Sequence, residues 1–476
     1  MDLIAALHLA APEAFLAVSA LALLLVGATL RPSALVVWVL GGLALIVAAA
    51  LAATGPLGAA FSGGFVADQA SAFAKVAIYL MSAVALLLGA GWLGRLRARQ
   101  FEYPILVLLA ALGMGVMVSS GDLISLYVGV ELQSLALYVL AAFRRDDAKA
   151  SEAGLKYFVL GALSSGLLLY GASLIYGFAG SVKFADIAAA AHAGAANGVL
   201  FGLVFLICGL AFKVSAAPFH MWTPDVYEGA PTPVVAFFAA APKFAAMVLF
   251  ARALGDAFPG AADQWRQVII VIAVISMLLG AFAGLVQRNL KRLWAYSSIA
   301  NVGYALVGLS AGTKEGVQAM LVFMVLYMID VTGFFACLTA LSRDGKPMET
   351  MDDMAGLMRE RPGMALAMTA FCVSAIGIPP FSGFMAKIYV FKAIIDAGYG
   401  WVAVVGLVSS VIAAFYYLRL IKVMWFDPTA GKVDAAPLDA RGVAFAAALF
   451  SFPVVVVALK LLDPLARTAA SAFGLS

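Results

Sequence analysis

One short stretch of the sequence combines residues that can carry protons with a signal that breaks a helix. In AFKVSAAPFHMWTPD, residues 211–225, Lys213 ends a long apolar run, Pro218 follows five residues later, and His220 comes after it. An interior proline removes a helix hydrogen bond and clashes with the preceding turn, so the helix is predicted to break here. A buried lysine changes its protonation state readily, and histidine titrates near neutral pH. These residue types are typical of a proton path.

A second stretch, GIPPFSGFMAKIYVF (residues 377–391), repeats the pattern with Pro379, Pro380 and then Lys387. In lipid, the carbonyls freed by such a break need protein or water partners, so both breaks are predicted to face the protein interior. All the basic residues inside apolar runs are lysines: Lys75, Lys156, Lys213, Lys243, Lys387, Lys392 and Lys460. Lys75, Lys392 and Lys460 lie nearer the ends of their runs, so we expect them to snorkel to the surface.

Intramembrane carboxylates and lysines usually mark ion or proton pathways. The candidate proton-carrying residues are Glu131, Lys156, Lys213, His220, Lys243 and Lys387. Three of them also have a named structural interpretation: Glu131 as a static ion pair, Lys156 as a lysine that snorkels inward, and His220 as a capped interface residue. Lys156 could instead reach Glu131. The role of Asp330 stays open, because its carboxylate could pair with a lysine or with another subunit.

The composition places the chain in the membrane. Hydrophobic residues make up 64% of it and charged residues 12%, and the mean hydropathy is +1.03. Soluble domains carry about 45–50% apolar and about 25% charged residues. No nucleotide-binding loop, haem motif, iron–sulfur motif or basic nucleic-acid stripe is present, and Cys208, Cys337 and Cys372 show neither disulfide nor metal spacing. We interpret these cysteines as small buried hydrophobes.

The long continuous apolar runs predict an all-α integral membrane protein, because only helices or closed barrels satisfy the backbone in lipid. Residues 183–194 are read as either a short interfacial helix or a loop. The N-terminus has no Lys or Arg before Arg31, so it lacks the basic region of a signal peptide. The fourteen predicted spans are roughly 12–30, 33–53, 71–94, 103–119, 121–142, 152–178, 197–219, 231–253, 264–286, 291–310, 315–341, 363–394, 399–425 and 439–463.

The basic residues orient these spans. With the N-terminus outside, the inner loops and helix ends carry 18 Lys and Arg residues, including Arg31 and Arg97, and the outer ones carry 5. Cytoplasmic loops are enriched in Lys and Arg, so both termini are predicted to lie outside.

Spans four to eight form one set of five and spans nine to thirteen form another. The broken spans, the seventh and the twelfth, are the fourth members of these two sets. Five is odd, so the second set begins on the opposite side of the membrane, as in an inverted repeat. The predicted domains are therefore residues 1–102 (spans one to three), 103–253 (first five-helix repeat), 254–426 (second, inverted repeat) and 427–476 (loop and span fourteen).

Four stretches, 151–171, 212–237, 289–309 and 377–391, resemble the antiporter-like membrane subunits of respiratory complex I, the bacterial NADH–quinone oxidoreductase. Within that family the pattern is most similar to the N subunits and their mitochondrial counterpart, NADH dehydrogenase subunit 2. The resemblance implies functional roles for Glu131, Lys156, Lys213, Lys243 and Lys387, with His220 nearby. M subunits carry a glutamate where Lys387 stands, and L subunits carry a long lateral helix after the bundle, so both fit less well.

The resemblance implies a proton-translocating subunit in the bacterial inner membrane that binds no cofactor itself. NADH, FMN, iron–sulfur clusters and quinone would be used elsewhere in the complex. Its partners would be other membrane subunits, including further antiporter-like ones, and the lipid bilayer. The expected mechanism separates a Glu131–Lys156 pair, drives a proton from Lys213 through Lys243 to Lys387, and releases it outside, with uptake past His220. The alternatives are a cation/proton antiporter subunit, a membrane hydrogenase subunit, or a structural scaffold whose lysines form static ion pairs.

Overall fold

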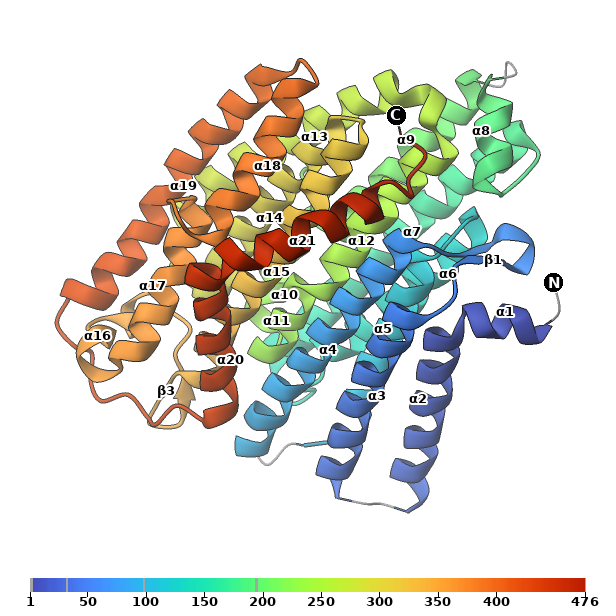
Figure 1. Ribbon diagram of the computed structural model, residues 1–476. Helices are drawn as coiled ribbons and strands as arrows, with labels where there is room; N and C mark the ends of the chain where they lie inside the picture. The colour runs from blue at the N-terminus through green and yellow to red at the C-terminus, as the bar shows by residue number, and fades with distance from the viewer. Residues whose placement is uncertain (1–2, 31–32, 97–98, 193–195, 476) are drawn as a thin grey trace.

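The computed structural model describes residues 3–30, 33–96, 99–192 and 196–475, and is a bundle of helices (Figure 1). Arg31 and Arg97 lie outside the described residues. Eleven helices in the described part of the chain are long and apolar enough to cross a membrane. Together with α5 (Glu102–Val118), α14 (Leu290–Ser310) and the interrupted pair α17–α18 (Pro362–Ile376 and Ser382–Asp396), they correspond to the fourteen predicted spans. The predicted all-α membrane fold is confirmed.

The N-terminal part contains three spanning helices and a small hairpin. After the short α1 (Leu3–Leu9) come α2 (Ala11–Thr29), α3 (Ala34–Thr54) and α4 (Gln69–Arg95). Between α3 and α4, β1 (Gly58–Ala60) pairs antiparallel with β2 (Phe65–Ala67) in a connection that the sequence placed outside the spans. Asp68 caps α4, since its side chain accepts a hydrogen bond from the amide of Ser71 and the Ser71 hydroxyl accepts one from the amide of Asp68.

The next helices correspond to spans four to eight. The segment predicted as an interfacial helix or a loop is helical as α8, and residues 193–194 of that prediction lie outside the described residues. Span seven corresponds to α9 and the start of the irregular segment after it, and α10 follows the predicted end of this span. Span eight corresponds to α11, α12 and a π-helical turn. The bounds after α5 are α6 (Leu123–Ala141), α7 (Ala148–Ala179), α8 (Phe184–His192), α9 (Ala196–Val214), α10 (Thr223–Gly229), α11 (Thr232–Ala239), α12 (Ala241–Arg252) and the π turn Ala253–Ala257.

Spans nine to thirteen begin with α13 (Ala262–Gly284), which follows a 3-10 turn at Pro259–Ala261. After α14 come α15 (Lys314–Ala340), the interrupted α17–α18, and α19 (Gly400–Phe426). The α15–α17 connection holds a second small hairpin, β3 (Ser342–Arg343) with β4 (Lys346–Pro347), then a 3-10 turn (Asp352–Met354) and α16 (Leu357–Glu360).

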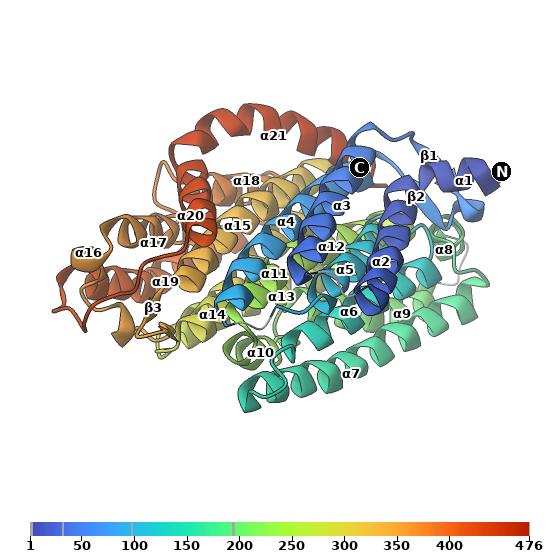
Figure 2. The ribbon, with the colours of Figure 1, turned by 90° about the horizontal axis from the view of Figure 1, so that it is seen from below.

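The last span differs from the uninterrupted helix that the sequence predicted. It consists of α20 (Leu438–Leu449), a π-helical segment (Phe450–Val454) and α21 (Val455–Ala470). Inside the π segment Phe452 is extended, with φ −164° and ψ 130°, and Pro453 follows it. α21 therefore leaves the direction of α20 and runs across the bundle over α15 and α4 (Figures 1 and 2).

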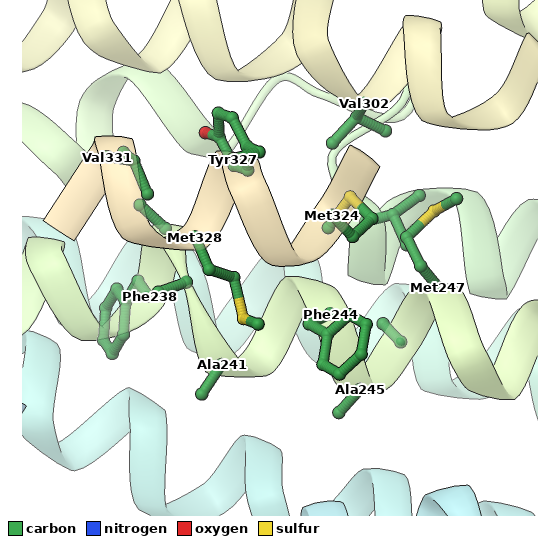
Figure 3. Close-up of a cluster of buried hydrophobic side chains, with 14 of the residues drawn as sticks. Phe238, Ala241, Phe244, Ala245, Met247, Val302, Met324, Tyr327, Met328 and Val331 are labelled. Carbon is green, nitrogen blue, oxygen red and sulfur yellow. The ribbon is translucent and has the colours of Figure 1, made fainter. Parts of the chain in front are cut away.

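The core lies where α11 and α12 meet α15. Every residue of α12 is buried. Figure 3 shows Met328 of α15 extending toward Ala241 and Phe244 of α12 and Met324 beside Met247, while Tyr327 lies on the other side of α15. Because lipid is as apolar as these side chains, close packing rather than hydrophobic exclusion stabilises such contacts. This tight layer holds α12 and α15 in place around the polar groups described next.

Two basic residues near the outer ends of spans differ from their predicted positions. Lys75 does not snorkel: it is 3% exposed, and its Nζ lies 2.8 Å from Oε1 of Glu13 on α2. Arg252 is one of the five basic residues predicted to lie in the outer loops, but it is 1% exposed and donates 2.8 Å hydrogen bonds to both carboxylate oxygens of Asp68. The physical reason is the same in both cases, because a buried cation is tolerated when a carboxylate pairs with it. The side chain of Lys392 is exposed and Lys460 is exposed, as predicted.

Candidate functional site

The seventh span breaks at residues 215–222, here called the helix-7 break. Ser215 has φ +67°, a left-handed backbone that residues other than glycine rarely adopt. Such conformations cost on the order of 1–3 kcal/mol and cluster at functional sites. Side chains satisfy the freed backbone groups: the indole of Trp222, within the break, donates to the Phe212 carbonyl (3.0 Å), and the Ala217 amide donates to Ser276 of the neighbouring α13 (2.8 Å).

Lys213 lies just before this break and points toward α6. Its Nζ donates to the hydroxyl of Ser134 at 2.8 Å. Glu131 lies one turn away on the same helix, where its carboxylate accepts a hydrogen bond from Ser165 of α7. Residues three apart on a helix share a face, so α6 presents Glu131 and the Lys213 partner on one side. Glu131 is therefore the carboxylate on the same face of α6 as Ser134, the residue that Lys213 binds.

Lys156 does not pair with Glu131, and that expectation is wrong. Its Nζ lies 2.7 Å from Glu152 and 2.7 Å from Asp225 of α10, and its side chain is 41% exposed. Lys156 thus reaches toward the predicted inner surface, as the snorkelling interpretation held. Asp225 also accepts from Arg292 of α14 at 2.6 Å. Burial raises the pKa of Asp225, but hydrogen bonds from Lys156 and Arg292 outweigh it and hold the pKa below its usual range.

Charged side chains line a cavity of about 140 Å³ at this surface, formed by α7 and α10. Lys149 and Glu228 complete it, with the ammonium of Lys149 3.6 Å from the carboxylate. The cluster links the ends of α7, α10 and α14 by exchangeable ion pairs. The sequence singled out Lys156 here but not Asp225, although the repeated carboxylates of TPDVYEG were a visible signal.

Lys243 begins α12 in the middle of the bundle and is 1% exposed. Its Nζ donates to Ser298 of α14 at 2.5 Å, and the ring of Tyr227 lies 5.2 Å from it. The hydroxyl of Tyr327 on α15 also donates to Ser298, at 2.8 Å. Lys243 is therefore joined to α15 through one serine hydroxyl, and hydroxyls both donate and accept protons.

The twelfth span breaks at residues 377–381, here called the helix-12 break. Gly377 has φ +89° and ends α17, and a Cβ there would lie 3.0 Å from the Lys387 side chain. Lys387, 6% exposed, folds back along α18 into this space. Its Nζ donates to the carbonyls of Ala375 (2.9 Å) and Ile376 (3.0 Å) and to Ser410 of α19 (2.7 Å).

The remaining predicted residues differ in how the structure places them. His220 lies in the helix-7 break, half-buried, and its Nδ1 is buried without a hydrogen-bond partner among the described residues. Asp330 of α15 does not contact a lysine; its carboxylate accepts hydrogen bonds from Ser374 and Ser382 beside the helix-12 break.

Lys213, Lys243 and Lys387 thus share one arrangement, an ammonium bound to a serine of a neighbouring helix, half-buried for Lys213 and buried for the other two. Such an ammonium can release a proton without a large rearrangement, because the serine can accept or donate. Sequence reasoning missed Ser134, Ser298 and Ser410, because serine is an ordinary residue in membrane helices. Among the described residues, no group of three or more His, Cys, Asp or Glu side chains lies close enough to hold a metal ion.

Residues 120–413 match the family model described as NADH:quinone oxidoreductase/Mrp antiporter, transmembrane. This segment contains Glu131, Lys213, Lys243 and Lys387. The chain is 73% identical over 390 residues to NADH-quinone oxidoreductase subunit N of Caulobacter sp. (strain K31), covering 80% of this chain and 81% of that one.

Two solved structures have a similar fold over nearly the whole chain. One is respiratory complex I from Thermus thermophilus with bound aureothin: TM-score 0.80, 34% identity, and coverage of 96% of this chain and 99% of that one. The other is the membrane-bound sulfane sulfur reductase, an archaeal respiratory membrane complex: TM-score 0.87, 28% identity, and coverage of 97% of each chain.

Proposed function

The chain belongs to the family of NADH:quinone oxidoreductase and Mrp antiporter membrane subunits, and from that membership we propose that it is a proton-translocating membrane subunit of an NADH–quinone oxidoreductase. The observation that carries the proposal is the row of lysines inside the bundle, buried or half-buried, each bound to a serine of a neighbouring helix. NADH oxidation and quinone reduction take place in other subunits of the complex, and this chain moves protons.

In this proposal, Glu131 controls the first lysine of the row. Loss of the Glu131 charge favours release of the Lys213 proton, because an opposite charge nearby favours a charged ammonium. The proton passes to Lys243 and then to Lys387, which releases it outside. Because moving each charge against 100 mV costs about 2.3 kcal/mol, the redox reaction elsewhere in the complex must drive the transfer.

Lys156 takes a different role from the one first expected. Its bonds to Glu152 and Asp225 support a place in the inner-surface cluster rather than in a pair with Glu131. We assign proton uptake to this side, past His220, whose buried Nδ1 is free to take part. A shift of α7 or α10 would exchange the partners of Lys156 and alter the charge near the uptake route.

The arrangement in the membrane is part of the same proposal. Both termini face the periplasmic side of the bacterial inner membrane, which the excess of basic residues in the inner loops supports. The domains are residues 1–102, the inverted repeats 103–253 and 254–426, and residues 427–476. The partners are the other membrane subunits of the complex, including antiporter-like ones, and no redox cofactor is bound by this subunit.

The test is Lys213→Ala in the intact complex, reconstituted in vesicles, with NADH–quinone turnover, proton pumping and the amount of assembled complex measured together. Lys392→Ala is the matched control, because the Lys392 side chain is 74% exposed and pairs with Asp396 one turn away, its one ion pair in the described part of the chain. We expect turnover and pumping to fall together in the first variant and to stay normal in the second. Undiminished pumping by assembled Lys213→Ala complex would contradict the proposal.

Two other functions make different predictions. The fold similarity to the sulfane sulfur reductase supports, as a second candidate, a subunit of a related respiratory complex or cation/proton antiporter. The proteins that co-purify with the chain distinguish these. A scaffold with static ion pairs predicts that Lys213→Ala reduces assembly instead of pumping.

A further inference from the structure

A half-buried carboxylate, that of Asp330, lies in the second half of the chain and contacts none of the lysines described above directly. Oδ2 of Asp330 accepts hydrogen bonds from Ser374 (2.5 Å) and Ser382 (2.7 Å). A third hydroxyl, that of Ser451, lies 2.8 Å from that of Ser382. All three serines are fully buried. Oδ1 of Asp330 is buried too, and it has no hydrogen-bond partner among the described residues.

The three serines come from interruptions in two spans. Ser374 precedes the helix-12 break, and Ser382 begins α18 just after it. Ser451 belongs to the π segment Phe450–Val454, which the sequence had predicted as plain helix. Irregular backbone at membrane depth is tolerated where it is buried in protein, and π turns are frequent at functional sites. Two irregular segments thus converge on one carboxylate.

A small cavity lies beside Asp330, and Tyr327 in its lining leads toward Lys243. The volume of the cavity is about 30 Å³, and its lining includes Asp330, Ser374, Asn301 and Tyr327. A polar cavity needs about 10–15 Å³ of such volume to hold a water. Tyr327 donates to Ser298, the same serine that accepts from Lys243. Hydroxyls therefore lead from Lys243 to the cavity that Asp330 lines.

On its other side, Asp330 adjoins the partners of Lys387. Ser374, which donates to Asp330, is followed in the chain by Ala375, whose carbonyl accepts from Lys387. The titratable groups near Asp330 are Tyr327 on its own helix, Lys243 on α12, Lys387 on α18 and Tyr417 on α19, which bonds to Ser297 at the cavity. α17 and the π segment contribute serines, and α14 contributes Ser297 and Asn301.

We propose that Asp330 carries protons between Lys243 and Lys387, with one water in the cavity as the link. The Lys243 ammonium gives a proton to the Asp330 carboxylate, leaving a neutral amine and a carboxylic acid. The acid then gives the proton to the neutral amine of Lys387, which restores the carboxylate and forms an ammonium. The net change is one proton moved from Lys243 to Lys387. This role rests on the proposed function and adds a carboxylate step to its second half.

The experiment compares Asp330→Asn, Asp330→Glu and Lys213→Ala in the intact reconstituted complex. Asp330→Asn keeps acceptor capacity for the serines but cannot carry a proton. We expect turnover and pumping to fall together by roughly tenfold or more, since a positioned acid–base group typically contributes on the order of 100-fold or more to proton transfer. Asp330→Glu should restore at least part of the loss. Asp396→Asn, a surface aspartate paired with Lys392, is the control and should behave as wild type.

The outcomes separate this role from the proposed function. If Lys213→Ala loses pumping while Asp330→Asn keeps it, the Asp330 role is overturned and the function stands. If both variants pump normally, the function fails as well. Equal losses in Asp330→Asn and Asp330→Glu overturn the role, because they indicate a structural site.

If Asp330→Asn does not assemble, Ser382→Ala gives the test, since it leaves the carboxylate and removes one of its donors. A shifted pH profile of turnover supports the role, and an unshifted profile overturns it.

Discussion

The helix-7 and helix-12 breaks both interrupt a span beside a lysine inside the bundle, but the lysine makes different hydrogen bonds at the two breaks. Lys213 lies before its break and donates to one side chain, Ser134, on another helix. Lys387 lies after its break and donates to the carbonyls of Ala375 and Ile376 and to Ser410. An ammonium has three hydrogens, so the charged form of Lys387 has all its donors used.

This difference means that only one break depends on the protonation of its lysine. In the helix-7 break, Trp222 and Ser276 satisfy the freed backbone groups, so Lys213 can lose a proton without changing that part of the chain. Lys387 must give up one of its three bonds when it becomes neutral. Proton release at the second break is therefore linked to the hydrogen bonding of the broken helix.

Replacing each lysine by methionine is the most direct test of this difference between the two breaks. Both Lys213→Met and Lys387→Met should lower proton transfer by about 100-fold or more, as expected for loss of a positioned proton carrier. Their stabilities should differ. Lys387→Met leaves the half-buried Ala375 carbonyl without this partner, which costs up to about 1–3 kcal/mol, whereas Ser134 still donates to Val130 without Lys213.

The measurement is the midpoint of thermal unfolding of the purified complex, together with turnover. Both variants remove one ammonium from the bundle. The free-energy cost of desolvating that ammonium is therefore lost in both, and it largely cancels when their unfolding midpoints are compared. Lys387→Met should unfold at a lower temperature than Lys213→Met. Equal midpoints would show that the helix-12 break does not depend on Lys387.

A second prediction concerns the carboxylate on α6. Glu131→Gln keeps an oxygen that accepts from Ser165 but removes the charge one turn from the Lys213 partner. We expect turnover to fall by roughly tenfold, equivalent to about 1.4 kcal/mol in the barrier. Ser165→Ala is the control: it keeps the charge and loses one hydrogen bond, so its effect should be smaller. A larger loss in Ser165→Ala would assign Glu131 a structural role instead.

The features predictable from the sequence were those with a local signal. Hydropathy marked the spans, prolines marked both breaks, and charge marked Lys213, Lys243 and Lys387. The partners had no such signal, because they depend on how each helix is rotated against its neighbours. A serine such as Ser134 in an apolar helix is too common to single out.

The residues whose positions or partners were predicted wrongly have the same explanation, because their partners depend on how the helices pack. Lys75 was expected at the surface, but Glu13, more than sixty residues earlier in the chain, packs beside it and makes burial tolerable. Lys156 was expected to reach Glu131, but two carboxylates on the inner side are closer. Pro453 was a visible signal for the interruption in the last span, although its link to Asp330 through Ser451 needed the three-dimensional arrangement.

The smallest predicted effect tests whether the helix-7 break is independent of its lysine. Ser276 accepts from the Ala217 amide and donates to the Ile272 carbonyl of its own helix, both in buried positions. Ser82 on α4 is equally buried but makes only the second kind of bond, to Ile78. Ser276→Ala should therefore cost about 1–3 kcal/mol, the penalty for an unpaired buried amide, and Ser82→Ala distinctly less.

Thermal unfolding of the two serine variants measures this difference, and turnover measures its consequence. If Ser276 only satisfies the broken backbone, Ser276→Ala should lower the unfolding midpoint while turnover per assembled complex stays near wild type. Lys213 keeps Ser134 in that variant, so its proton exchange is not directly altered. A loss of turnover as large as that of Lys213→Met would mean that the backbone of this break and its lysine act together, and the contrast with the helix-12 break would disappear.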